Sequence, residues 1–282
     1  FGWLKTLYPL WARFGPEEIF VSAQVGLAEL ALSGCTLSSD HLYLYPGGAR
    51  LEDTVHAAAE IGLRFHPTRG AMSIGESAGG LPPDTLVEDE QAILEDCIRV
   101  VDAFHNPSEG SMCRVGVAPC SPFSVSRDLM REAALLARDK GVMLHTHLAE
   151  TADEEDLCVE RFGCRPLDYL EDVGWLNDQV WLAHGIHFSE DEIVRLGKHG
   201  VGVCHCPSSN MVLASGQCRT CELEAVGVAV GLGVDGSASN DSSNLMEGVR
   251  HALMINRLTY GVEAVSHLDV LRWATQGSAS CL

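Results

Sequence analysis

The chain has 282 residues, of which 46% are hydrophobic, so it is long enough to bury a large core as one domain over 1–282. Its 39 acidic and 19 basic residues give a formal net charge of −20, which would repel nucleic acids and anionic membrane surfaces. No apolar run reaches the roughly 18 residues that a transmembrane helix needs. The 11 cysteines lie in apolar segments, where reduced thiols are expected, and this indicates a cytoplasmic protein.

Short β-rich runs alternate with helical periodicity from residue 15 onward. In chain order we predict helix 16–32, strand 34–40, helix 51–61, strand 62–67, helix 84–104, strand 113–120, helix 126–140, strand 142–150, helices 153–162 and 166–173, strand 180–186, helix 189–199, strand 200–207, helix 221–225, strand 228–236, and helices 244–258 and 267–275. The strands are nearly continuous apolar runs, which are typical of parallel strands buried on both faces. Alternation of this kind predicts a parallel sheet.

Residue types at the ends of the predicted helices support these limits. Ser126, Ser189 and Asp241 are expected to cap helix starts, and Gly141 and Gly200 are expected to close helix ends. Seven strand–helix units are one fewer than a closed eightfold barrel contains, and no strand precedes helix 16–32. We therefore predict an α/β fold of the (β/α)8 TIM type whose first strand lies upstream of the given sequence.

Polar residues cluster where the predicted strands end, which is where such barrels carry their catalytic groups. His145 and His147 lie two residues apart and so face the same side of a strand, and Glu150 follows just beyond. His184 and Asp235 follow two later strands. Taken alone, the histidine pair could belong to the core and Asp235 to a turn. Together the set predicts an active site, and imidazole ligands suit zinc or iron.

Four segments in order, HTHLAE (145–150), LAHGIHFSEDEI (182–193), CHCPSSNMVLASG (204–216) and GLGVDGSASNDSSNLM (231–246), resemble the amidohydrolase superfamily. The resemblance is to its guanine deaminase and triazine hydrolase branch. Segments 38–46 and 64–84 look most like the members of that branch that act on 8-oxoguanine. The family fold implies that the first strand and a small β-sandwich domain are missing, so we expect a partial barrel truncated at both ends.

The resemblance also implies roles for individual residues. It makes His147 a metal ligand, Glu150 the proton shuttle, His184 a contact to water or substrate, and Asp235 both a ligand and the catalytic base. It implies one divalent metal ion, with zinc preferred over iron. Two further ligands would come from an H-x-H motif on the missing first strand.

Substrate recognition is likewise implied by the resemblance. Arg69, Cys120 and His184 are expected to contact a small purine or related heterocycle, with 8-oxoguanine hydrolysed to urate and ammonia as the preferred reaction. Guanine or a triazine is the alternative substrate, and a homo-oligomer is compatible with the family. An alternative of another class is a catalytically inactive barrel fragment.

A serine esterase is the other functional hypothesis. GESAG (75–79) matches the G-x-S-x-G elbow, with Ser77 as the nucleophile. That elbow requires a helix immediately after the serine, whereas Pro82 and Pro83 indicate a loop. We therefore expect Ser77 to lie in a loop.

Two further patterns have ordinary structural explanations. Cys204-x-Cys206 with Cys218-x-x-Cys221 could form a four-thiolate zinc site, but apolar surroundings favour buried thiols. The acidic run Asp153–Asp156 is expected to be a solvated helix start, which favours negative charge.

Aromatic residues gather at the beginning of the chain. We expect Phe1, Trp3, Tyr8 and Trp11 to serve in packing rather than in ligand stacking.

Overall fold

The computed structural model describes residues 2–282 and has an α/β architecture of parallel strands alternating with helices. In these residues seven strands follow one another in chain order. They are β1 (Leu37–Leu42), β2 (Arg64–Ala71), β3 (Gly116–Pro119), β4 (Leu144–Leu148), β5 (Val180–His184), β6 (Gly202–His205) and β7 (Val230–Leu232). The predicted TIM-type class, with seven parallel strands in this chain, is confirmed.

The chain divides into two compact units. Unit 1 comprises the residues up to Ala28 and Thr36–Thr146, and unit 2 comprises Glu29–Cys35 and His147–Leu282. The helix α2 and the strand β4 each contribute residues to both units.

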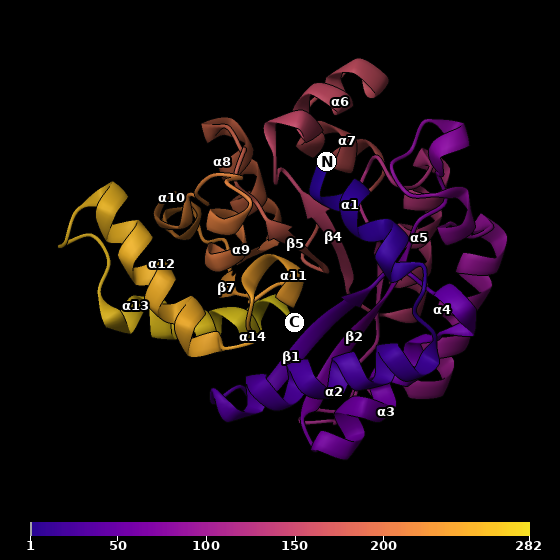
Figure 1. Ribbon diagram of the computed structural model, residues 1–282. Coiled ribbons are helices and arrows are strands. Elements are labelled where there is room, and N and C mark those ends of the chain that lie inside the picture. The colour runs from indigo at the N-terminus through magenta and orange to yellow at the C-terminus, as the bar shows by residue number, and fades with distance from the viewer. Residues whose placement is uncertain (1) are drawn as a thin grey trace. The chain divides into compact units, whose positions relative to one another are not determined.

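Unit 1 contains β1 to β3, the start of β4 and the helices that connect them. The helices are α1 (Gly2–Trp11), α2 (Pro16–Leu32), α3 (Leu51–Ile61), α4 (Glu90–Phe104) and α5 (Arg127–Lys140), with short 3-10 turns η1 (Pro46–Gly48), η2 (Glu76–Ala78) and η3 (Asp84–Leu86). The register places Leu37 beside Arg64 and Thr68 beside Gly116. The helices α4 and α5 lie side by side (Figure 1). Fully buried residues such as Leu51, Val117 and Leu129 form the core of this unit.

The helix α1 was not among the predicted elements. Pro9 lies inside it, and a proline normally disfavours a helix interior. Tyr8 is 2% exposed and packs with Leu44 and Met72, and Trp11 joins the same cluster. The aromatic side chains therefore serve in packing, as expected for those that are described, and Phe1 lies outside the described residues.

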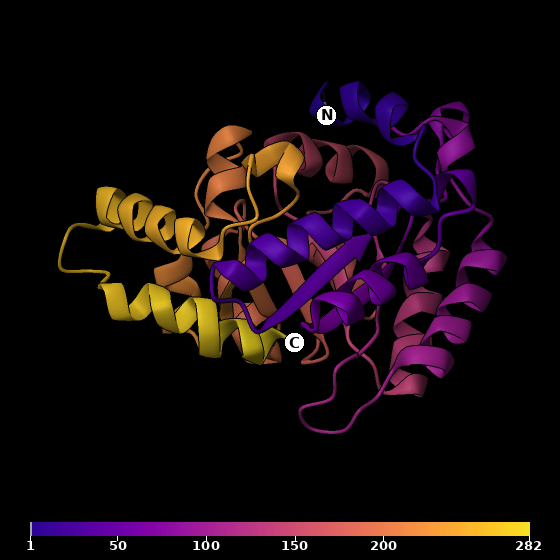
Figure 2. The ribbon, with the colours of Figure 1, turned by 60° about the horizontal axis from the view of Figure 1, so that its bottom comes forward.

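Unit 2 contains the end of β4 and β5 to β7. Its helices are α6 (Ala152–Phe162), α7 (Pro166–Asp172), α8 (Glu190–His199), α9 (Pro207–Val212), α10 (Thr220–Ala225), α11 (Ser237–Asn240), α12 (Leu245–Tyr260), α13 (His267–Arg272), the π-helical turn η4 (Trp273–Gly277) and α14 (Ser278–Cys281). All residues of β5 are buried. The helices α12 and α13 lie side by side, as the yellow ribbons of Figure 2 show.

Most predicted helix ends are confirmed. The Ser126 and Ser189 side chains each accept a backbone N–H in the first turn of α5 and α8, and Gly141 and Gly200 close these helices in a left-handed conformation. The prediction for Asp241 is wrong, because it ends α11 with φ 64°. Asn244 caps α12 instead.

No helix in residues 2–282 has the length and apolar character needed to cross a membrane.

Candidate active site

The end of β4 places two of the predicted site residues in unit 2. His147 is the penultimate residue of β4, and Glu150 follows the strand after a tight turn. Ala149 forms that turn with φ 55°, in the left-handed region that residues other than glycine rarely adopt. The Glu150 side chain is 24% exposed, so the turn leaves a carboxylate accessible at the strand end.

His184 ends β5 and is almost fully buried. Its Nδ1 lies 2.9 Å from Oδ1 of Asn210, an acceptor, so Nδ1 carries a proton. Its Nε2 lies 3.9 Å from both Oε2 of Glu150 and Oδ2 of Asp235. Burial by itself lowers the pKa of His184, but the two carboxylates and the Asn210 hydrogen bond outweigh burial and raise this pKa above its ordinary value.

Asp235 lies three residues beyond β7, with φ 64°. Its Oδ2 accepts a hydrogen bond of 2.6 Å from Ser209 and one of 3.1 Å from Ser239, and its Oδ1 accepts one of 2.7 Å from the Gly236 N–H. Burial by itself raises the pKa of Asp235. His184 and these hydrogen bonds outweigh burial and hold the pKa below its ordinary value, so the carboxylate is ionised.

His147 faces this group as well. Its ring stacks on that of His184, with centroids 5.6 Å apart and planes 24° apart, and its charge contributes to lowering the pKa of Asp235. His145, two residues earlier, packs its ring against His41 in unit 1, with centroids 4.7 Å apart. Unit 2 thus brings His147, Glu150, His184 and Asp235 together, and this cluster is the candidate active site.

His205 ends β6 beside this cluster and is 1% exposed. Within the described residues neither of its ring nitrogens has a hydrogen-bond partner. Burial, assisted by His184, lowers its pKa to about 3, so the ring is neutral. His66 is the third residue of β2, which continues past the predicted end at Pro67 to Ala71.

Three positioning contacts were not predicted from the sequence. Ser209 and Asn210, adjacent on α9 and fully buried, bind Asp235 and His184. Glu154 is 2% exposed and binds the backbone of the turn at Ala149, so the prediction of a wholly solvated acidic run is wrong at this residue. The T-x-x-E spacing from Thr151 to Glu154 is a capping-box signal that points this carboxylate toward backbone N–H groups.

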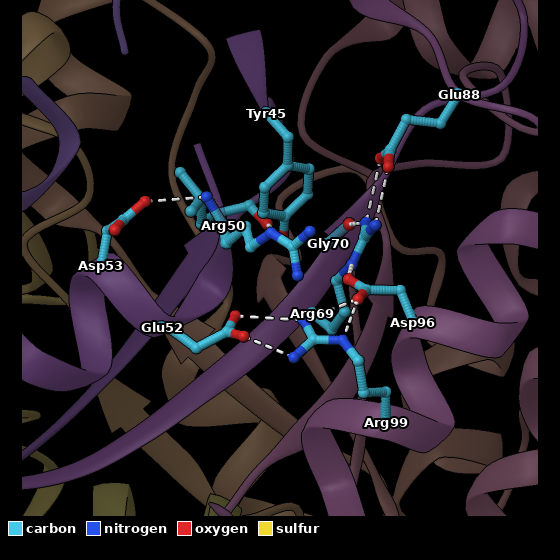
Figure 3. A network of polar contacts seen from close by, with 10 residues as sticks. Tyr45, Arg50, Glu52, Asp53, Arg69, Gly70, Glu88, Asp96 and Arg99 are labelled. Atoms are coloured by element: carbon cyan, nitrogen blue, oxygen red, sulfur yellow. Dashed lines mark hydrogen bonds and ion pairs between the residues drawn. The ribbon is translucent and has the colours of Figure 1, made fainter. Parts of the chain in front are cut away.

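Arg69, predicted to contact substrate, lies on β2 in unit 1 and is 2% exposed. Figure 3 shows its guanidinium between two carboxylates, with a 2.7 Å bond from Nε to Asp96 and bonds of 3.0 and 2.7 Å to Glu88. It also donates to the Gly70 carbonyl and lies 4.0 Å from the ring centre of Tyr45. Four of its five N–H groups are therefore committed within unit 1.

The same network extends through Asp96 to Arg99, which also pairs with Glu52 (Figure 3). Burial by itself raises the pKa of Asp96, but Arg69 and Arg99 outweigh it and lower this pKa. The network ties α3, β2 and α4 together in unit 1.

Cys120 follows β3 and is half-buried. It packs against the cluster that includes Tyr8 and Met72. Its predicted contact with substrate stays a prediction.

Ser77 lies in the short turn η2, followed by a left-handed glycine and a loop rather than by a helix. Its hydroxyl donates to Asp84. The strand–turn–helix context of an esterase elbow is absent here, as expected from Pro82 and Pro83.

No group of three or more His, Cys, Asp or Glu side chains in residues 2–282 lies close enough to hold a metal ion. The four-cysteine zinc site is therefore not formed, and Cys206 and Cys218 are buried thiols. His147 and Asp235 nonetheless have donor atoms that zinc accepts. Catalytic zinc sites use three protein ligands, so these two residues fit part of such a site.

Residues 3–282 match the amidohydrolase family, and the chain belongs to this family. Over its whole length it is 54% identical to 8-oxoguanine deaminase of Pseudomonas aeruginosa, of which it covers 63%. It is 42% identical to hydroxydechloroatrazine ethylaminohydrolase of Pseudomonas sp. strain ADP, of which it covers 59%. The crystal structure of atrazine chlorohydrolase from Arthrobacter aurescens TC1 complexed with zinc matches 96% of this chain and 61% of that chain, with a TM-score of 0.92 and 33% identity.

The predicted membership of the amidohydrolase superfamily is thereby confirmed. The chain spans about three fifths of the length of these relatives.

Proposed function

We propose that the protein is a metal-dependent hydrolytic deaminase of a purine base, with 8-oxoguanine as the preferred substrate and urate and ammonia as products. The observation that carries the proposal is the cluster of two carboxylates and two imidazoles at the ends of β4, β5 and β7. The 54% identity to an 8-oxoguanine deaminase supports the choice of substrate.

Asp235 and His184 have complementary electrostatic roles in this reaction. The ionised Asp235 carboxylate accepts a proton from the water that attacks the ring carbon bearing the amino group. The raised pKa of His184 favours an imidazolium that stabilises negative charge developing at the attacked centre.

Glu150 is the proposed proton shuttle. Its carboxylate is partly exposed and 3.9 Å from His184, so it can reach a bound ring. It takes one proton of the attacking water and delivers it to the adjacent ring nitrogen. The other water proton, accepted by Asp235, leaves with the departing amine as ammonia, so both carboxylates return to their starting state.

His147 and Asp235 would hold the divalent ion, for which zinc is preferred because it is the metal in the chlorohydrolase structure. The ion supplies Lewis-acid activation of water at neutral pH. Arg69 and Cys120 remain the proposed substrate contacts, although Arg69 has at most one N–H left for a ligand.

The test is ammonia release from 8-oxoguanine, guanine and a hydroxytriazine, using the protein with any sequence that flanks these 282 residues in its gene. We expect 8-oxoguanine to be the best substrate, and we expect a chelator to abolish activity until zinc is restored. Glu150→Gln should lower kcat by about 10²- to 10⁴-fold, because general acid–base catalysis contributes that much.

Ser77→Ala is the control and should have the activity of the parent protein. Activity that survives chelation but is lost in Ser77→Ala would establish the esterase class instead. Preference for the triazine would move the protein to the ethylaminohydrolase group. A protein that neither binds zinc nor releases ammonia would be the catalytically inactive alternative.

A further inference from the structure

The buried carboxyl group of Glu154 holds the backbone of the turn that carries Glu150. Glu154, the third residue of α6, accepts the Ala149 N–H at 3.0 Å through Oε1 and the Glu150 N–H at 2.9 Å through Oε2. Its side chain is buried, so water does not replace these bonds. Each side-chain oxygen of Glu154 thus accepts one backbone N–H of the turn.

This arrangement differs from ordinary capping at the same position of another helix. Glu192 is also the third residue of its helix, α8, and is also buried, but it accepts the N–H of Ser189, the residue that caps that helix. Its two oxygens also accept hydrogen bonds from Arg165, each at 2.9 Å. In α6 the capping residue is Thr151, and Glu154 reaches past it to the two residues before. The Glu154 carboxyl group therefore holds the β4–α6 turn.

The other side of the turn is also held by hydrogen bonds. The Ala149 carbonyl accepts the N–H groups of Ile186 and His187, each at 2.9 Å, and the Leu148 carbonyl accepts that of Gly185. These residues directly follow His184 on β5. The residues after β5 thus bind the carbonyl groups of the turn, and Glu154 binds its N–H groups. Together these hydrogen bonds hold the backbone in its left-handed conformation.

We propose that Glu154 is a positioning residue for the proton shuttle: it fixes the backbone at Ala149 and Glu150 so that the Glu150 carboxylate points toward His184. This inference rests on the proposed function, because it assigns Glu154 an effect that is exerted only through Glu150. Glu154 itself does not touch the substrate.

The experiment compares Glu154→Gln with Glu192→Gln in the holoenzyme. Glutamine keeps one oxygen acceptor but replaces the other with an amide nitrogen that faces a backbone N–H, so one bond of the turn is lost. Misplacement by about 1 Å can lower a rate by about 10²-fold. We expect Glu154→Gln to lower kcat by about 10- to 100-fold with KM changed less than about threefold, and Glu192→Gln to leave kcat within about twofold.

The decisive measurement is the double variant with Glu150→Gln. If Glu154 acts through Glu150, then Glu154→Gln has no further effect on the residual ammonia release of Glu150→Gln. A general structural role would lower the rate by the same factor in both backgrounds, and this would overturn the inference. A kcat of Glu154→Gln within about twofold of the parent value would overturn it too.

Thermal unfolding of each variant shows whether it is folded. If Glu154→Gln does not fold, Glu154→Asp takes its place, because aspartate keeps the carboxylate but is one methylene shorter, and the same loss of kcat is expected. An inactive parent protein, or a fully active Glu150→Gln, would reject the proposed function. If the parent is active and Glu150→Gln is impaired, the proposed function stands. A negative result with Glu154→Gln then rejects only the inference about Glu154.

Discussion

Ala149, His184 and Asp235 all adopt left-handed backbone conformations, with φ values of 55°, 70° and 64°. Each lies at or just after the end of a strand that supplies the candidate site. For residues other than glycine this conformation costs on the order of 1 kcal/mol or more, and such strain is common at functional sites. Three hydrogen bonds help to offset this cost: the Glu150 N–H donates to Glu154, His184 donates to Asn210, and Asp235 accepts from Ser209.

The ionisation of Glu154 gives a pH dependence of stability. Burial raises its pKa to about 8, and the negative charge of Glu150 adds to this effect, although N–H groups of Ala149 and Glu150 oppose it. Between about pH 5 and 8 the unfolded chain has released this proton while the folded protein still binds it, since an ordinary glutamate has a pKa of about 4.3. The free energy of unfolding should therefore fall as pH rises through this window.

Urea unfolding of the parent protein and Glu154→Gln at pH 5.5, 6.5 and 7.5 tests this expectation. Glutamine has no proton to release, so the stability of the parent relative to the variant should decrease with rising pH. A difference that stays constant over about two pH units would contradict the raised pKa of Glu154.

The positions of the candidate site residues His147, Glu150, His184 and Asp235 were predictable, because polar residues in such barrels gather at strand ends, where these four lie. The residues that orient them were not. Asn210 binds His184 across 26 positions of sequence, so no local pattern indicates this contact. The T-x-x-E spacing signals a capping role for Glu154, but it does not specify the N–H groups of Ala149 and Glu150, which precede the capping residue.

At the scale of elements, the existence of the strands was predictable but their lengths were not. Strand 62–67 was predicted to end at Pro67, whereas β2 continues to Ala71, since pairing with β1 and β3 outweighs the missing N–H of the proline. The helix limits 16–32 and 51–61 were correct, because Pro16 opens one helix and Gly62 closes the other.

The turn η4 packs closely on β7, and Gly277 makes this contact possible. A Cβ on Gly277 would lie 1.9 Å from the Val230 carbonyl oxygen, which is backbone and cannot move aside easily. Gly277→Ala should therefore lower the free energy of unfolding by about 1–3 kcal/mol or more, as measured by urea unfolding.

Gly248→Ala is the matched control for that substitution. Gly248 lies inside α12 with nothing within 4 Å of the added Cβ, so alanine should stabilise the protein by roughly 0.5–1 kcal/mol. Equal effects of the two alanines would show that η4 does not constrain β7.

At the scale of the whole molecule, a net charge of −20 dominates the electrostatics. Local ion pairs, such as those of Arg69 with Glu88 and Asp96, use some of the 19 basic residues. Because the chain has 39 acidic residues, the negative charges outnumber the positive ones about two to one. Fold class and family were predictable at this scale, since both depend on patterns that run through the whole chain.

Self-repulsion of this charge should make stability depend on salt. Raising NaCl from about 10 to 200 mM shortens the Debye length from about 30 to below 10 Å, so the thermal midpoint should rise and then level off. The thermal midpoint is measured by calorimetry in NaCl and in sodium sulfate at equal ionic strength. The comparison distinguishes screening of the negative charges from the stabilisation that sulfate gives because it is excluded from the protein surface. A midpoint that rises only in sulfate would contradict the charge-repulsion argument.

The helix α9 presents two neighbouring side chains to two different strand ends, since Ser209 binds Asp235 and Asn210 binds His184. One peptide unit therefore links the proposed base to the proposed electrophile. The relative placement of Asp235 and His184 is therefore set by a single peptide unit of α9 as well as by the strands that carry them.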